Sequence, residues 1–165
     1  MIQFFDAILT GCKLNVLTKE SFKKITKLTN KEMDYLVKEN YFSNEKYYTK
    51  DEKIECIKIT DKGIDFAKKE IGFKKIYYSN SITHDVAHSK VVADKIEEFG
   101  VTIREYKSEK ELPKIQGKTR VDGVLEVGGK QIAIETVTSF YKQSQINKKR
   151  EYCQEQGIEY NEYRI

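Results

Sequence analysis

The chain has few cysteines, one proline and no tryptophan, and it lacks the long apolar runs of membrane proteins. No apolar run approaches the ~18 residues that a membrane-spanning helix needs, so the sequence predicts no membrane span. The N-terminal segment MIQFFDAILTG is short and has no basic leader, so we expect no export signal. The three cysteines are far apart, without a CxxC pair, which argues against a disulfide framework and a zinc site. We therefore expect reduced thiols in a cytoplasmic protein.

The sequence also lacks internal repeats, low-complexity tracts and a glycine-rich phosphate loop. Its 165 residues are 39% hydrophobic and 34% charged, enough apolar content for a core in one domain or two small ones. The net charge is +4, and all of the excess lies in residues 1–80, which hold 16 Lys against 12 Asp and Glu. Such a charge favours nucleic-acid binding only where a suitable fold uses it.

Apolar residues at helical spacing predict three short helices in the first forty residues. The first covers residues 1–9 and ends near Gly11, the second is capped by Thr18, and the third by Thr29 or Asn30. Two short helices joined by a tight turn are typical of a helix-turn-helix.

Residues 47–49 and 54–60 are rich in β-branched and aromatic side chains and predict two strands around a charged loop. Thr60 is then the expected cap of a fourth helix, with Ile64 facing inward. Helices followed by a strand pair and another helix resemble the winged-helix family of DNA-binding domains, a resemblance that covers residues 1–70.

The resemblance implies that the third helix lies in the major groove and that the wing touches phosphate. The expected nucleic-acid contacts are therefore Lys31, Tyr35 and Lys38 on the helix, with Lys50 and Lys53 on the wing. The same helix also presents acidic side chains, which repel phosphate, so the affinity of one copy should be low. Either two copies act together or the domain has become a protein-contact module.

Residues 73–82 are apolar enough to be buried and predict a packed connector between two halves. A helix then covers residues 83–100, with Thr83 as its expected cap. His84 and His88 extend its buried stripe toward the start of the helix. They could act as accessory metal or phosphate ligands, but we favour a hydrogen-bonded pair, because no third ligand lies at zinc spacing.

The second half contains a strong hairpin signal, Gly128–Gly129, between two β-branched runs. Antiparallel pairing about this turn brings position 122 opposite position 135, because the two positions lie equally far from the Gly128–Gly129 turn. Asp122 and Glu135 would then lie at one end of the hairpin. Such carboxylates suit Mg²⁺ or Mn²⁺. A strand at 101–106, a loop at 107–118, a helix at 139–156 and a last strand at 158–165 complete the expected αβββαβ order.

This order, with Asp on the second strand and Glu on the third, resembles the PD-(D/E)XK nuclease superfamily. The resemblance implies a metal ion held by Asp122 and Glu135, which would activate water for attack on a phosphodiester. Val137 stands where the superfamily has its lysine, and Val121 replaces the proline before the aspartate. A lysine from the following helix, Lys142 or Lys148, could reach in instead.

Three consecutive basic residues on that helix, Lys148, Lys149 and Arg150, have two interpretations. Such a run is usually a solvated helix face. Alternatively it forms a patch beside the acid pair that contacts the nucleic-acid backbone.

The motifs LTKESF, ITDKGIDFA, HDVAHSKVVADKIEE, RVDGVLEV and AIET, in this order, resemble the replication-relaxation family of plasmid and conjugative-element proteins. The resemblance implies an α+β chain with a winged helix-turn-helix at 1–72, a connector at 73–82 and a restriction-endonuclease-like domain at 83–165. It implies DNA as the partner, in plasmid replication or transfer, with a homodimer or other replication proteins as further partners. The favoured function is a DNA-binding accessory protein with a degenerate nuclease-like domain. The alternatives are an active Mg²⁺- or Mn²⁺-dependent endonuclease and a transcriptional regulator of the element.

Overall fold

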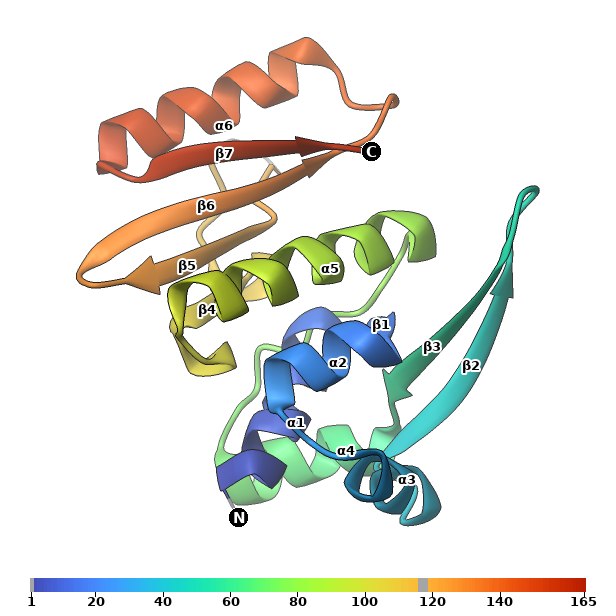
Figure 1. Ribbon diagram of the computed structural model, residues 1–165. Helices are drawn as coiled ribbons and strands as arrows, with labels where there is room; N and C mark the ends of the chain where they lie inside the picture. Colours follow the sequence, from blue (N-terminus) through green and yellow to red (C-terminus); the bar gives the residue numbers. More distant parts are fainter. Residues whose placement is uncertain (1, 116–118) are drawn as a thin grey trace. The chain divides into compact units, whose positions relative to one another are not determined.

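The computed structural model describes residues 2–115 and 119–165, so Met1 and the part of the predicted loop at 116–118 lie outside the described residues. The fold is mixed α+β with two separate sheets, as expected for the fold class. The chain divides into two compact units, Met1–Arg104 and Glu105–Ile165 (Figure 1). Within the described residues, no helix is both long and apolar enough to cross a membrane.

The first unit holds most of the helices and a three-stranded antiparallel sheet with the order β1-β3-β2. Its elements are α1 (Ile2–Leu14), β1 (Val16–Thr18), α2 (Lys19–Thr26), α3 (Asn30–Lys38), β2 (Phe42–Tyr48), β3 (Lys53–Ile59), α4 (Asp61–Phe66), a π-helical turn η1 (Ala67–Ile71) and α5 (Ile82–Phe99).

Local capping signals set the starts of three of these helices. The side chains of Thr18 and Thr60 accept hydrogen bonds from the first turns of α2 and α4, as predicted. Thr29, rather than Asn30, caps α3 and forms a capping box with Glu32. These interactions lie within four residues of sequence, which is why the sequence alone predicts them.

Helix α1 continues past Gly11 to Leu14, so its predicted end near Gly11 is wrong. Gly11 is buried inside the helix, where a Cβ atom would lie 2.7 Å from the ring of Phe42 and 2.8 Å from Ile59. The glycine therefore permits close packing of α1 on the sheet and does not end the helix.

Helix α5 packs in the first unit, so the predicted division into residues 1–72, 73–82 and 83–165 differs from the observed boundary. Its side chains bond to neighbouring elements: Lys24 of α2 pairs with Asp94 at 2.8 Å, and Ser89 donates to the Val16 carbonyl. The predicted connector also belongs to this unit, since the Tyr77 amide donates to the Cys12 carbonyl. The helix begins at Ile82 after Ser81, so Thr83 is not its cap.

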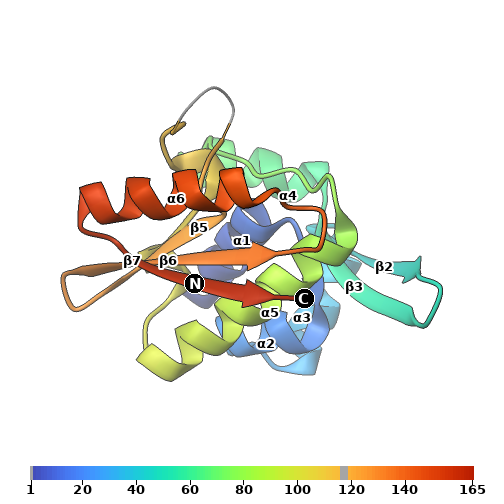
Figure 2. The same ribbon diagram turned by 90° about the horizontal axis from the view of Figure 1, so that it is seen from above.

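The second unit is a four-stranded sheet with the order β4-β5-β6-β7, in which the last pair is parallel and the others antiparallel. Its elements are β4 (Tyr106–Ser108), η3 (Glu109–Glu111), β5 (Gly123–Val127), β6 (Lys130–Val137), α6 (Gln143–Gln156) and β7 (Glu159–Arg164), and a 3₁₀ turn, η2 (Ile103–Glu105), crosses the boundary between the units. Helix α6 runs along the sheet above β6 and β7 (Figure 2). Val121, Val124, Ala133 and Cys153 form the core between them.

Two predicted elements of this half differ from the structure. The strand expected at 101–106 is a 3₁₀ turn followed by a short strand that extends to Ser108, where the loop was expected. The last helix begins at Gln143 and not near residue 139. The hairpin itself is as predicted, with positive φ at both Gly128 and Gly129.

Candidate functional site

The base of the β5–β6 hairpin brings together the two acids that the sequence singles out. The strand register pairs Gly123 with Ile134, which places Asp122 opposite Glu135. The Asp122 amide donates to Glu135 Oε2 at 3.0 Å, and the Thr136 amide donates to Asp122 Oδ2 at 2.9 Å. Each carboxylate is therefore fixed by a backbone donor of the opposite strand.

A lysine from helix α6 completes the cluster. The Lys149 ammonium contacts Glu135 Oε1 and lies 3.9 Å from Asp122 Oδ1. Glu135 is 0%, Lys149 4% and Asp122 8% exposed, so the charges interact largely out of water. We call Asp122, Glu135 and Lys149 the acid–lysine cluster.

Lys149 reaches the acids because it lies on the buried stripe of α6. Ile146 and Cys153, three residues before and four after it, are the other buried positions of the helix. Its Nζ also lies 4.9 Å from the centre of the Tyr141 ring. The spacing of Lys149 from Ile146 and Cys153 is the sequence signal that could have identified it, because this spacing places Lys149 on the apolar face of the helix.

The predicted alternatives to Lys149 lie elsewhere on α6. Lys142 is exposed and precedes the helix, where its amide donates to Gln145. Lys148 is exposed, and Arg150 pairs with Glu162 of β7 at 2.6 Å. Of the basic run, only Lys149 enters the cluster, where it is buried, while Lys148 and Arg150 are exposed.

Burial and charge act in opposite directions on the acids. Burial, followed by the charge of Asp122, raises the pKa of Glu135, while Lys149 and the Asp122 amide oppose the rise. Burial and the charge of Asp122 also raise the pKa of Glu109 nearby. Lys149, Arg120 and Lys110 oppose the rise at Glu109, so positive charges offset part of the effect of burial.

A polar cavity of about 220 Å³ adjoins the cluster. Its lining residues are Glu109, Thr119, Arg120, Asp122, Tyr141, Gln145 and Lys149. The cavity offers both signs of charge, since Arg120 and Lys149 face it together with Glu109 and Asp122. A small ion or a phosphate oxygen could therefore reach the edge of the cluster from this side.

The cluster does not fit a divalent metal ion as it stands. Such an ion needs several oxygen ligands around one point, but the Lys149 ammonium already lies against both carboxylates. Glu135 Oε2 and Asp122 Oδ2 are engaged by backbone amides. Throughout residues 2–115 and 119–165, no group of three or more His, Cys, Asp or Glu side chains could hold a metal.

The two histidines of α5 lie in a hydrogen-bonded cluster of the first unit. Their rings stack with centres 5.9 Å apart, and His84 Nδ1 lies 3.0 Å from Asp85 Oδ1. Asp85 also accepts from Tyr77 and Ser79, and only 3% of it is exposed. The surroundings of His84 and His88 are therefore those of polar groups packed at the start of a helix.

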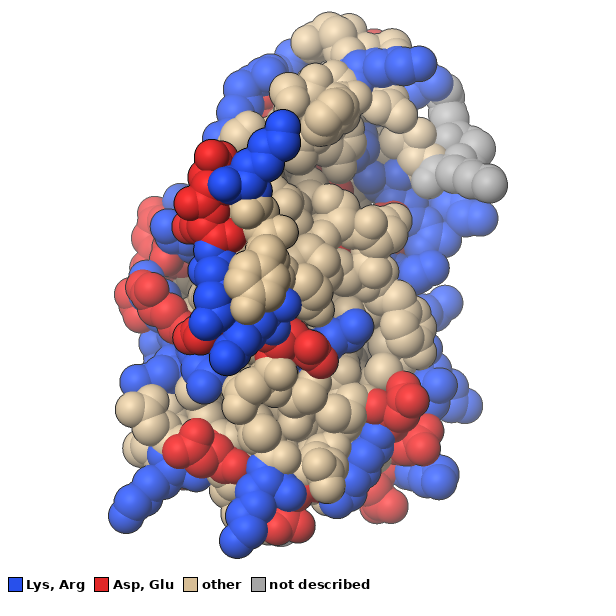
Figure 3. Space-filling view, turned by 90° about the vertical axis from the view of Figure 1, so that its right-hand side faces the viewer, with Lys and Arg blue, Asp and Glu red and all other residues tan. Residues whose placement is uncertain are grey.

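The predicted nucleic-acid contacts of the first unit are exposed. Lys31, Tyr35 and Lys38 lie on the outer face of α3, and 58% of Tyr35 is exposed. Lys50 and Lys53 lie at the end of the β2–β3 hairpin, which extends away from the helices of this unit (Figure 1). Basic and acidic side chains are mixed on the face of the molecule shown in Figure 3.

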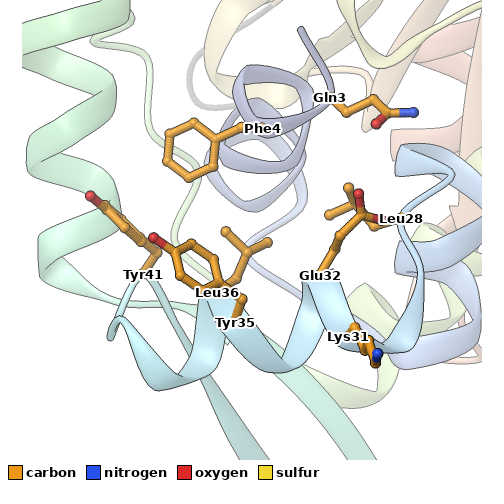
Figure 4. Close-up of a pocket in the computed structure, with 8 residues that line it drawn as sticks. All are labelled: Gln3, Phe4, Leu28, Lys31, Glu32, Tyr35, Leu36 and Tyr41. Carbon is orange, nitrogen blue, oxygen red and sulfur yellow. The ribbon is translucent and has the colours of Figure 1, made fainter. Parts of the chain in front are cut away.

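An apolar hollow of about 480 Å³ lies between α1 and α3. The rings of Phe4, Tyr35 and Tyr41 border it (Figure 4). Its acidic group, Glu32, is committed to the capping box of α3. The hollow therefore lacks an acid pair for phosphate chemistry, and the acid–lysine cluster is the better candidate for a reactive site.

Comparison with protein-family models, curated proteins and solved structures gives no match for this chain. The functional argument therefore depends on the geometry described above.

Proposed function

We propose that this chain is a DNA-binding accessory protein of a plasmid or other mobile element. In this proposal the first unit is a winged helix-turn-helix that docks on DNA. The second unit is a nuclease-like scaffold in which the ammonium group of Lys149 lies against the acid pair. The observation that carries the proposal is the acid–lysine cluster, because it joins residues of a PD-(D/E)XK pattern across two strands and a helix.

The order of elements in the first unit supports DNA docking. Helices α2 and α3 are joined by the short turn at residues 27–29, and the antiparallel hairpin β2–β3 follows. In winged-helix proteins the second of these helices enters the major groove and the hairpin contacts phosphate. Lys31 and Tyr35 would then face the groove, and Lys50 the backbone.

Acidic side chains limit the affinity of one copy. Hydrogen bonds from the amide and hydroxyl of Thr29 lower the pKa of Glu32, so this carboxylate stays charged beside the proposed DNA surface. The hairpin likewise carries Asp51 and Glu52 next to Lys50 and Lys53. We therefore propose that a homodimer, with two units on adjacent sites, supplies the working affinity.

The strand order of the second unit supports the nuclease-like scaffold. An antiparallel meander, β4-β5-β6, is followed by α6 and by a strand parallel to β6. This βββαβ order resembles the last five elements of the αβββαβ order of the PD-(D/E)XK nuclease superfamily. Val137 points into the core, and the cation comes from α6 instead.

A salt series tests the DNA-docking proposal. Binding of a fluorescent duplex by the full chain should weaken as salt rises. Replacing Lys50 and Lys53 by Gln should flatten the slope of log K against log[salt] by about 0.9 per lost phosphate contact. The double variant Lys68→Gln/Lys69→Gln, at two exposed lysines of η1, is the charge-matched control. An affinity for the duplex that changes neither with salt nor with the Lys50 and Lys53 substitutions would refute docking through the wing.

An active nuclease is the second candidate, favoured by one observation. The cation that is missing at position 137 is present in space, because Lys149 reaches both acids. Incubation of plasmid, linear and single-stranded DNA with Mg²⁺ or Mn²⁺ tests it. Cleavage by the wild type that disappears in Asp122→Ala, Glu135→Ala and Lys149→Ala, but persists in Lys148→Ala, would establish this candidate. Clean wild-type protein that leaves all three DNA forms intact would exclude it.

A further inference from the structure

We propose that Lys149 takes the place of a divalent metal ion in the second unit, so that its removal converts the acid pair into a metal-binding site. The inference rests on the nuclease-like interpretation of this unit. It concerns only ion binding, so it is tested without DNA.

The ammonium group lies where an ion shared by the two acids would lie. Lys149 Nζ contacts Glu135 Oε1 and is 3.9 Å from Asp122 Oδ1. A cation that bridged these two oxygens would have to displace it. A metal ion bound beside the ammonium group would instead be repelled by a positive charge a few ångströms away in a weakly screened interior.

The acid pair stays assembled by bonds that do not involve the lysine. The Asp122 amide holds Glu135 Oε2, and the Thr136 amide holds Asp122 Oδ2. Both bonds run between β5 and β6 or their ends, whose register the ladder fixes. Removing the ammonium group should therefore leave the two carboxyl groups oriented around the position that it occupied.

The lysine is also held in place from its own helix. Ile146 and Cys153 are buried on either side of Lys149, Cys153 packs in the core of this unit, and the ring of Tyr141 lies against the Lys149 Nζ. Release of the side chain would break its contacts with Glu135 and Asp122. A metal ion must therefore compete with a tethered cation.

An ion can nevertheless reach the position from solvent. The cavity of about 220 Å³ is lined by Asp122 and Lys149, so access does not require the hairpin to open. Hard divalent ions such as Mn²⁺ and Mg²⁺ match the oxygen ligands. A shortened neutral side chain at position 149 would leave room for the ion and its remaining waters.

Isothermal titration with Mn²⁺ alone tests the inference on the full chain. The variants are Lys149→Met, whose neutral side chain is one heavy atom shorter than that of lysine, and Lys148→Met, the matched control at the exposed neighbour. Lys149→Met should bind one Mn²⁺ at least about tenfold more tightly than the wild type, because the repelling charge is gone. Adding Glu135→Gln to Lys149→Met should abolish that binding, and Lys148→Met should behave as the wild type.

Two results would overturn the inference. One is a folded Lys149→Met protein that binds Mn²⁺ no more tightly than the wild type. The other is tight Mn²⁺ binding by Lys149→Met that persists when Glu135→Gln is added. If Lys149→Met is unfolded without metal, Mn²⁺ should restore its far-UV circular dichroism, and failure to do so also overturns the inference. If the wild-type protein does not bind DNA, the proposed function is refuted, but the expected Mn²⁺-binding results are unaffected.

Discussion

Removing the charge of Lys149 should destabilise the second unit more than any change to its surface lysines. Lys149 is 4% and Glu135 0% exposed, so above about pH 8, where Glu135 is ionised, Lys149→Met leaves this buried carboxylate without its cation. Breaking a buried ion pair from one side costs about 3–5 kcal/mol in the free energy of unfolding. Lys148→Met, at an exposed position of the same helix, should stay within about 0.5 kcal/mol of the wild type.

A double-mutant cycle separates the pair from the individual groups. Glu135→Gln alone removes the closest partner of the ammonium group and should cost a similar amount. The double variant Lys149→Met/Glu135→Gln should cost well below the sum of the single changes, since no unpaired charge of that pair stays buried.

Urea unfolding followed by far-UV circular dichroism measures these free energies, and the two units call for a fit that allows two transitions. The reasoning would be refuted if Lys149→Met were as stable as Lys148→Met. Strict additivity of Lys149→Met and Glu135→Gln would also count against it, because it would mean that the two side chains do not interact.

Three other features lead to measurable outcomes. Burial raises the pKa of all three cysteine thiols from 9.0, to about 12 for Cys12 and about 11 for Cys56 and Cys153. At pH 8 the native protein should therefore react with a thiol reagent more slowly than urea-unfolded protein, by about 100-fold for Cys56 and Cys153. Equal rates would contradict this. A Cβ atom at Gly123 would lie 2.2 Å from the hydroxyl of Tyr106. Gly123→Ala should therefore lower the free energy of unfolding by about 1–3 kcal/mol. The same substitution in a Tyr106→Leu background should cost less in the same urea assay. Burial, then Asp122, raises the pKa of Glu135 from 4.5 to about 8, so the folded state binds this proton more readily than the unfolded state. The contribution of Glu135 to stability should therefore decline as pH rises from about 4.5 to 8, and the difference between wild type and Glu135→Gln, measured by urea unfolding across this range, should show the slope.

The acid pair illustrates what sequence reasoning can achieve in a hairpin. Gly128–Gly129 defines the turn, and antiparallel pairing then defines which residues oppose each other along both strands. The position of Asp122 opposite Glu135 follows from this local rule. The same locality explains the caps at Thr18 and Thr60, whose partners lie three residues away.

The lysine illustrates where that reasoning ends. Lys142, Lys148 and Lys149 all lie on or beside one helix, and which of them faces the sheet depends on how α6 is rotated. That rotation is set by the packing of Cys153 against Val121 and Val124, residues of a different element. The spacing of Ile146 and Cys153 indicates that position 149 faces the sheet. The three consecutive charges at 148–150 instead favour a solvent-exposed helix face.

The sequence by itself determined the hairpin, the helix caps at Thr18 and Thr60 and the two facing acids, because each depends on residues a few positions apart or on strand register. Only the tertiary structure decided that α5 belongs with the first unit, that the three-residue strand β1 joins β3, and that Lys149 is the cation of the cluster. These depend on packing between elements distant in the chain, where burial against a particular neighbour outweighs local preference.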